Sequence, residues 1–357
     1  MKRLVYFMGG VLAIIGLLAI LAVKLSADSG SSAINNQLTI YNWGDYIDEK
    51  LLKSFEKQTG YHVNYVTFDS NEAMYTKIKQ GGTTYDIAIP SEYMIDKMTS
   101  EHLLVKLNHS KIKGLSNINP KFLHQAFDPQ NNYSIPYFWG TLGIVYNDQL
   151  VKTPPQHWSD LWSADYRNNL MLIDGAREVI GLALNQQGDS LNATDMGQLN
   201  KAYTHLKSLA PNVKAIVADE IKQYMINNEA AVAVTFSGEA AEMVSENKHL
   251  HYVVPSEGSN LWFDNIVIPK TAKNFDAAYA FINFMLTPEH AAQNAEYVGY
   301  ATPNTAAMRQ LPRSVTADKA FYPDATAMDH LEVYRNLGPK YLGIYNDLFL
   351  EFKMYRK

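Results

Sequence analysis

The order of strand and helix patterns between residues 38 and 98 is the feature that most restricts the fold of this chain. Strand patterns near residues 38–40, 62–68 and 85–89 are each followed by a stretch with the helical spacing of apolar residues. Such alternation predicts parallel strands joined by right-handed helical crossovers. Because ligands in these sheets bind beyond the carboxyl ends of the strands, the segments after the strands are candidate site residues.

Capping residues support the same helices. The first helical stripe, which starts near residue 51, is followed by Gly60, and the second is followed by Gly81. Glycine at these positions favours helix termination. Ser70 and Ser91 precede the second and third helical stretches, where a serine hydroxyl can cap the helix.

A second α/β pattern begins after residue 140. Strand patterns occur at residues 142–146, 170–173, 230–236, 249–254 and 259–268, and the C-terminal part is mostly helical, for example over residues 277–286 and 288–297. This order predicts two α/β lobes, between which the chain crosses near residues 140 and 260.

Composition excludes several classes of protein. The chain has 357 residues, which is enough for two domains, and a net charge of -5. This small negative charge is of the wrong sign for a nucleic-acid-binding protein, which needs basic patches. The absence of cysteine excludes disulfides, thiolate metal sites and cysteine nucleophiles.

Several enzyme and cofactor motifs are also absent. The sequence has no GxxxxGK phosphate loop, no GxGxxG, no GxSxG and no HExxH, and it shows no nucleophile–base pair. A tethered enzyme such as a hydrolase is therefore the weakest alternative. His249 and His251 share one face of a predicted strand, which is only a weak indication of a metal site.

The N-terminal residues have the features of a membrane segment. Lys2 and Arg3 precede an uncharged run over residues 4–23, long enough to cross a bilayer as a helix with its N-terminus in the cytoplasm. We expect an uncleaved anchor, and cleavage as a signal peptide near Ala33 is the alternative. Residues 26–36 are rich in Ser, Gly and Asn and predict a flexible tether.

An aromatic turn follows the first predicted strand. Residues 41–46 read YNWGDY, which places Trp43, Asp45 and Tyr46 together on an expected loop. Two interpretations remain open, since these side chains can serve packing and capping or can form one wall of a site for a small cation.

Longer segments resemble a known family. The segments are "YNWGDYI", "FDSNEAMYTKIKQGGTTYDIAIPSEYMIDKM", "FDPQNNYSIPYFWGTLGIVYN", "DLW", "DGAREV", "LWFDNIVIP" and "GYATPN". They are similar to the polyamine-binding proteins of spermidine/putrescine ABC transporters, and the likeness covers nearly the whole chain after the tether. It implies an α/β type II periplasmic-binding-protein fold, in which two lobes and a hinge enclose a ligand cleft, here preceded by the N-terminal hydrophobic helix.

The resemblance also implies the limits of the lobes. We expect residues 1–36 to be the anchor or signal segment plus the tether. The first lobe is expected over residues 37–140 and 263–308, and the second over residues 141–262 and 309–357.

The resemblance implies a set of ligand-binding residues. They are Trp43, Asp45, Tyr46, Ser91, Tyr93, Glu178, Phe236, Trp262, Asp264 and Tyr300. By this resemblance Glu178 meets one terminal amine and Asp264 meets the inner part of a polyamine. Phe236 stands where relatives have tryptophan. Gly175 stands where relatives often have a second aspartate, which leaves the preference between spermidine and putrescine open.

These residue types suit a polyamine. Each buried ammonium needs a carboxylate or a cluster of acceptors, and the methylene groups need flat apolar surface that aromatic rings supply. The resemblance implies a protein outside the membrane that delivers a polyamine to ABC permease subunits, without enzymatic activity, cofactor, metal or nucleic-acid partner. The same fold binding another small cationic solute or a metal ion is the alternative.

Overall fold

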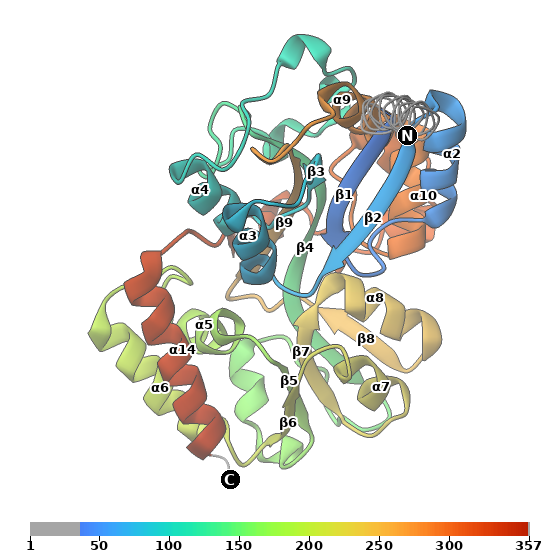
Figure 1. The fold of residues 1–357 in the computed structure, drawn as a ribbon. Coiled ribbons are helices and arrows are strands. Elements are labelled where there is room, and N and C mark those ends of the chain that lie inside the picture. Colours follow the sequence, from blue (N-terminus) through green and yellow to red (C-terminus); the bar gives the residue numbers. More distant parts are fainter. Residues whose placement is uncertain (1–35, 356–357) are drawn as a thin grey trace, which may run out of the picture.

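The chain forms two α/β lobes that share one set of paired strands (Figure 1). The computed structural model describes residues 36–355, so the predicted anchor over residues 4–23 lies outside the described residues. Within the described part, none of the helices is both long and apolar enough to span a bilayer.

Neighbouring strands pair in the order β2-β1-β3-β9-β4-β7-β5-β6, while β8 pairs with β4 and β10 pairs with β9. The first-lobe strands are β1 (Gln37–Trp43), β2 (His62–Phe68) and β3 (Ile87–Ala88). The second-lobe strands are β5 (Leu170–Ile173), β6 (Val213–Val217), β7 (Val232–Phe236) and β8 (Leu250–Val253). Two long strands, β4 (Ser134–Asn147) and β9 (Ser259–Val267), run through both, and β10 (Leu331–Glu332) lies beside β9.

Helices cover the sheets of each lobe. In the first lobe they are α2 (Glu49–Thr59), α3 (Asn71–Gln80), α4 (Glu92–Ser100), α9 (Phe275–Leu286), α10 (Pro288–Val298) and α11 (Thr305–Met308). In the second they are α5 (Ala176–Gln186), α6 (Met196–Leu209), α7 (Ile221–Ile226), α8 (Ser237–Glu246) and α14 (Gly338–Tyr355). The return segment holds α12 (Arg313–Thr316) and α13 (Ala325–Met328). Short 3₁₀ turns are η1 (His109–Lys111), η2 (Leu115–Asn117), η3 (Pro120–Phe122), η4 (Trp158–Trp162) and η5 (Ala164–Tyr166).

Most expected elements of the first lobe are confirmed. Parallel pairing joins β1 to both β2 and β3. Gly60 ends α2 in the left-handed conformation with φ 77°, and the Ser70 hydroxyl accepts the Ala73 N–H at 3.2 Å at the start of α3. Ser91 occupies the N-cap position of α4, but its hydroxyl makes no capping hydrogen bond.

The strand predicted at residues 142–146 is confirmed, but it is the second half of the longer β4, which has fourteen residues. The sequence analysis did not identify β6. The first half of β4 pairs with β9 and its second half with β7 and β8, so one strand belongs to two sheets. A local apolar pattern does not report this change of partner, because both halves of β4 are buried.

The hydrophobic cores separate near Gly140. Buried β4 side chains up to Trp139 pack in the first-lobe cluster with those of α9 and α10, whereas Leu142 and Ile144 pack with α5, α6 and α14. Gly140, between these two parts of β4, pairs with Trp262 of β9, whose side chain belongs to the first-lobe cluster.

Candidate functional site

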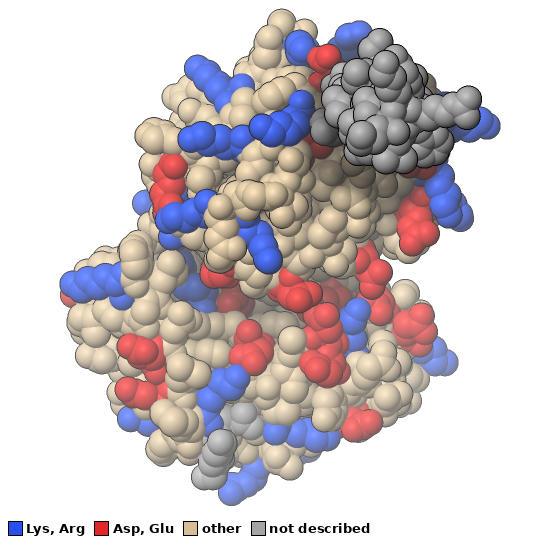
Figure 2. Space-filling view, in the orientation of Figure 1, with Lys and Arg blue, Asp and Glu red and all other residues tan. Residues whose placement is uncertain are grey.

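A hollow lies between the two lobes on the face shown in Figure 2, and acidic side chains gather along it. Carboxylates from both lobes influence one another here, because the charge of Glu72 on α3 acts on Glu178 on α5. The first-lobe wall comes from the segments after β1 and β3, as expected for the carboxyl ends of parallel strands.

Asp264 on β9 is the centre of the first-lobe wall. Its side chain is 6% exposed, and its two oxygens accept hydrogen bonds from the hydroxyls of Tyr46 at 2.5 Å and Ser91 at 2.7 Å. Burial raises the pKa of Asp264 to about 6, although both hydroxyl contacts act in the opposite direction. Within residues 36–355 no cationic side chain forms an ion pair with this carboxylate.

The position of Ser91 is fixed by Asn71. The Asn71 amide donates to the Ser91 hydroxyl, and the Ser91 backbone N–H donates to the Asn71 side-chain oxygen, both at 3.0 Å. Ser91 also forms a β-bridge with Asp264. The hydroxyl that the sequence suggested as a helix cap is therefore held against the site carboxylate.

Aromatic rings surround Asp264. The Tyr300 ring packs nearly perpendicular to those of Tyr46 and Trp262, with centroids 5.3 and 5.1 Å apart. Phe236, at the end of β7 in the second lobe, lies 6.3 Å from Trp262. Four of the expected aromatic residues thus form one continuous group that reaches from one lobe to the other.

Two glycines allow the rings to approach the second lobe. A Cβ at Gly238, in the first turn of α8, would lie only 0.9 Å from Tyr300 Cε1. A Cβ at Gly140 would lie 2.4 Å from both Ser237 Oγ and Trp262 Cζ2. The contact between the lobes therefore depends on the absence of side chains at these positions.

Glu178 and Tyr93 lie close to one another from opposite lobes. Burial raises the pKa of the Glu178 carboxyl, and the charge of Glu72 adds to this rise while Arg177 opposes it. The Glu178 carboxylate folds over the start of α5, since a Cβ at Gly175 would lie 2.1 Å from Glu178 Oε2. Burial raises the pKa of the Tyr93 phenol, and the charges of Glu72 and Glu178 add to the rise. The Tyr93 hydroxyl donates to Glu72 Oε1 at 3.3 Å.

Trp43 and Asp45 do not join the group around Asp264. The Trp43 indole N–H donates to the Ile89 carbonyl at 3.0 Å, and its ring packs on Phe68 at 4.6 Å. Asp45 is exposed, with a φ of 48°, and lines an outer groove of about 410 Å³ beside α2 and Tyr65. Packing therefore accounts for the position of Trp43, and a surface turn accounts for that of Asp45.

Sequence reasoning missed two buried groups at the lobe junction. Glu92 accepts the Phe263 backbone N–H at 2.9 Å. Tyr334 is 5% exposed, and burial raises its pKa, to which the charges of Glu178 and Glu92 add. Glu92 directly follows Ser91 at the start of α4, and no motif in the sequence analysis included it. Tyr334 lies in the return segment, where no strand or helix pattern marked it.

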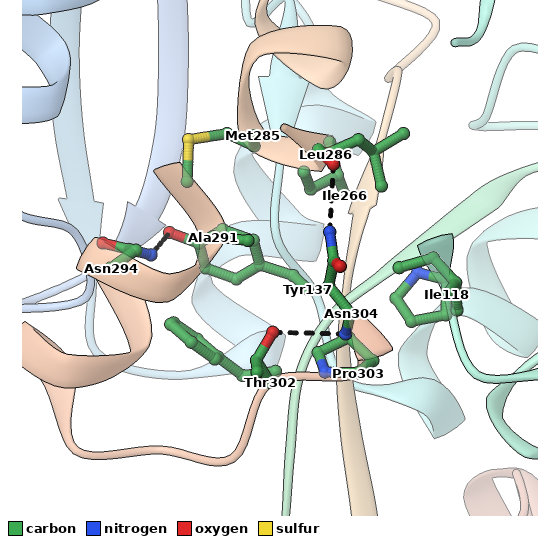
Figure 3. A pocket seen from close by; sticks show the side chains of 12 residues that line it. Ile118, Tyr137, Ile266, Met285, Leu286, Ala291, Asn294, Thr302, Pro303 and Asn304 are labelled. Carbon is green, nitrogen blue, oxygen red and sulfur yellow. Dashed lines mark hydrogen bonds between the residues drawn. The ribbon is translucent and has the colours of Figure 1, made fainter. Parts of the chain in front are cut away.

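The enclosed cavity of the first lobe is too small for a solute (Figure 3). Its volume is about 20 Å³, room for a single water molecule. Polar groups on its wall pair with each other, for example the Asn294 amide with the Tyr137 hydroxyl at 2.8 Å.

The two histidines of the predicted strand, His249 and His251, both contact Asp148, at 3.0 and 2.9 Å. Across residues 36–355, no group of three or more His, Asp or Glu side chains is arranged to hold a metal ion.

Comparison with known proteins identifies the family. The model of the bacterial extracellular solute-binding proteins matches residues 50–323. The chain belongs to this family. It is therefore a solute-binding protein and not an enzyme.

Members of the family with known names are similar over almost the whole chain. The spermidine/putrescine-binding periplasmic protein of Escherichia coli is 39% identical over 94% of this chain and 97% of its own length. The structure of the substrate-binding protein PotD from Streptococcus pneumoniae, in complex with calcium and HEPES, is 64% identical with a TM-score of 0.85 and covers 90% of this chain and 100% of its own. That of a putative spermidine/putrescine ABC transporter protein from Listeria monocytogenes is 60% identical with a TM-score of 0.84, covering 90% and 99%.

Proposed function

We propose that this solute-binding protein clamps a polyamine, spermidine or putrescine, between its lobes and delivers it to the permease of an ABC importer. The observation that carries the proposal is Asp264, a buried carboxylate that receives two hydroxyl hydrogen bonds but no cation from the described residues. The relatives named for spermidine and putrescine support the same ligand class.

The chemistry of the wall fits an alkyl ammonium ligand. A carboxylate buried without a cation is costly, and an ammonium group from the ligand would remove that cost. The rings of Tyr46, Trp262 and Tyr300 offer apolar surface for methylene groups and faces that attract positive charge by about 0.5 to 2 kcal/mol per good contact.

Closure of the lobes is the proposed binding mechanism. We assign residues 37–140 and 263–308 to the first lobe and residues 141–262 and 309–357 to the second lobe. Ligand favours the closed state because only that state contacts Asp264 and Glu178 together, which lie on different lobes. Hinge closure of this kind is established for periplasmic binding proteins.

The contacts of the remaining candidate ligand-binding residues support a place beside the cleft to different degrees. Ser91, Phe236 and Tyr93 lie beside the proposed cleft by their contacts with Asp264, Trp262 and Glu72. We propose that Trp43 and Asp45 border it, and their contacts with Ile89 and the outer groove make them the weakest members.

A ligand panel tests the proposal. Thermal unfolding should be measured with spermidine, putrescine, a basic amino acid and calcium, each well above its expected dissociation constant. A ligand at about 100 times its dissociation constant stabilises by roughly 2.7 kcal/mol, so the true cargo will stand out. If the unfolding temperature rises only with calcium or only with the amino acid, the ligand is not a polyamine and the alternative cargo is supported.

We further propose that residues 4–23 remain attached as an anchor that holds the protein on the outer face of the cytoplasmic membrane. Their length and the absence of a cysteine for lipid attachment support this. Mass spectrometry of the native protein decides the question, and a mature N-terminus near Ala33 would refute the anchor.

A further inference from the structure

A carboxyl group outside the expected site lies where β9 passes between the lobes. Glu92 is 1% exposed, and its Oε2 accepts the backbone N–H of Phe263, the neighbour of Asp264. On one side of this point Ser91 bridges Asp264, and on the other β10 pairs with Ser259 and Asn260. The Glu92 carboxyl therefore occupies the gap between two pairings along the edge of β9.

A hydroxyl without a partner lies next to this gap. Tyr334, two residues after β10, is 5% exposed, and its hydroxyl has no hydrogen-bond partner within residues 36–355. It lies against α5, 3.5 Å from where a Cβ at Gly181 would stand. Tyr334 follows β10 along the edge of β9 on which Glu92 accepts the Phe263 N–H. Burial raises the pKa of this phenol, and the charges of Glu178 and Glu92 add to the rise while Arg177 opposes it.

We propose that Glu92 and the Tyr334 hydroxyl form an additional subsite of the cleft, which takes one ammonium group and favours a triamine over a diamine. The inference rests on the proposed polyamine function. A buried hydroxyl left unpaired costs free energy, and a buried carboxyl holds its charge at low cost only beside a cation. An ammonium between them donates to the hydroxyl oxygen and to the carboxylate that Glu92 becomes when it releases its proton.

The number of carboxyl groups supports the preference. Asp264 lies on β9, Glu92 accepts the N–H of the residue before it, and Glu178 lies on α5 of the second lobe. A diamine can supply one ammonium each to Asp264 and Glu178, and a triamine has a third for Glu92. Glu92 is thus a specificity-determining residue, whereas Asp264 and Glu178 serve any polyamine.

The protonation of Glu92 provides a second measurable quantity, the number of protons released when the ligand binds. Burial raises the pKa of Glu92 to about 8, to which the charge of Asp264 contributes, while the Phe263 N–H and Arg177 oppose it. Arg177 is occupied elsewhere, because its guanidinium stacks on the Tyr334 ring at 4.3 Å and donates to Leu191 and Asn192. The Tyr93 phenol, which Glu92 also influences, is neutral at this pH because its own pKa is raised. Glu92 is therefore mostly protonated in the free protein at pH 7 and loses its proton when an ammonium binds.

Titration calorimetry of the wild type, Glu92→Gln and Tyr334→Phe with spermidine and with putrescine tests the subsite. Experiments at pH 7 in two buffers of different ionisation enthalpy count the protons released. Glutamine keeps an oxygen for the Phe263 N–H, and phenylalanine keeps the ring beneath Arg177. Glu49→Gln on the exposed face of α2 is the control, since it makes the same Glu-to-Gln exchange at an exposed position.

We expect Glu92→Gln to weaken spermidine at least tenfold more than putrescine and to remove most of one proton from the release seen with spermidine, because a carboxyl with a pKa of about 8 is mostly protonated at pH 7. Tyr334→Phe should weaken spermidine selectively, and Glu49→Gln should change neither ligand. Equal losses for both ligands, or proton release unchanged by Glu92→Gln, overturn the subsite while leaving the polyamine function intact. If Glu92→Gln does not fold, a wild type that releases no proton with spermidine overturns it. A wild type that binds no polyamine overturns the proposed function itself.

Discussion

Gly238→Ala tests whether the contact between Tyr300 and α8 controls closure. The added methyl group would lie 0.9 Å from Tyr300 Cε1 and 1.5 Å from Cδ1, far inside van der Waals contact. The ring cannot stay where it is, because Tyr46, Phe138 and Trp262 pack around it with centroids 5.1 to 6.0 Å away. Either Tyr300 leaves the aromatic group or the lobes separate.

The size of the effect follows from these contacts. Forcing an extra methyl group into a packed region typically costs about 1 to 3 kcal/mol. Each aromatic pair lost adds roughly 0.5 to 1.5 kcal/mol. Since Tyr300 follows α10 of the first lobe and Gly238 begins α8 of the second, the methyl group strains the contact between the lobes. The methyl group alone should lower spermidine affinity by about 5- to 150-fold, and each aromatic pair lost should lower it by roughly a further 2- to 13-fold.

Calorimetric titration measures the affinity, and small-angle scattering with and without ligand reports closure. Gly343→Ala is the control, because a Cβ there has no atom within 4 Å. The Tyr300→Ala background separates this contact from other effects, and Gly238→Ala should cost almost nothing there. An equal cost in both backgrounds, or wild-type affinity in Gly238→Ala, would show that the contact does not control binding.

Three further substitutions test the walls of the cleft. Asp264→Asn should weaken spermidine by about 2 to 5 kcal/mol in calorimetry. It should also stabilise the ligand-free protein at pH 8 by roughly 2 to 3 kcal/mol in urea unfolding, because a carboxyl whose pKa is raised to about 6 loses its stabilising protonated form as the pH rises through 6. Trp43→Ala should weaken binding by about 1 kcal/mol or more without unfolding the lobe, and a loss of folding would make Trp43 a core residue. Gly175→Asp should not tighten binding, since its Cβ would displace the Glu178 carboxylate, and tighter binding would contradict the observed position of Glu178.

The sequence by itself determined the local elements of the first lobe. Gly60 and Ser70 fix helix ends through contacts within four residues, so their effect is visible in the sequence. The alternation of strands and helices likewise placed Tyr46 and Ser91 at one edge of the sheet. Family resemblance added Asp264, Glu178 and the aromatic residues, which no local pattern distinguishes from core.

Only the tertiary structure decided how these residues meet. Asp264 receives its hydrogen bonds from Tyr46 and Ser91, which are 218 and 173 positions away in the chain. Glu92 and the β10 segment that precedes Tyr334 likewise both contact β9, although they are distant in the sequence. Strand and helix patterns repeat every two to four residues and report only which side chains are buried. The pairing of distant strands decides which buried side chains share a site, and no short-range period in the sequence encodes that pairing.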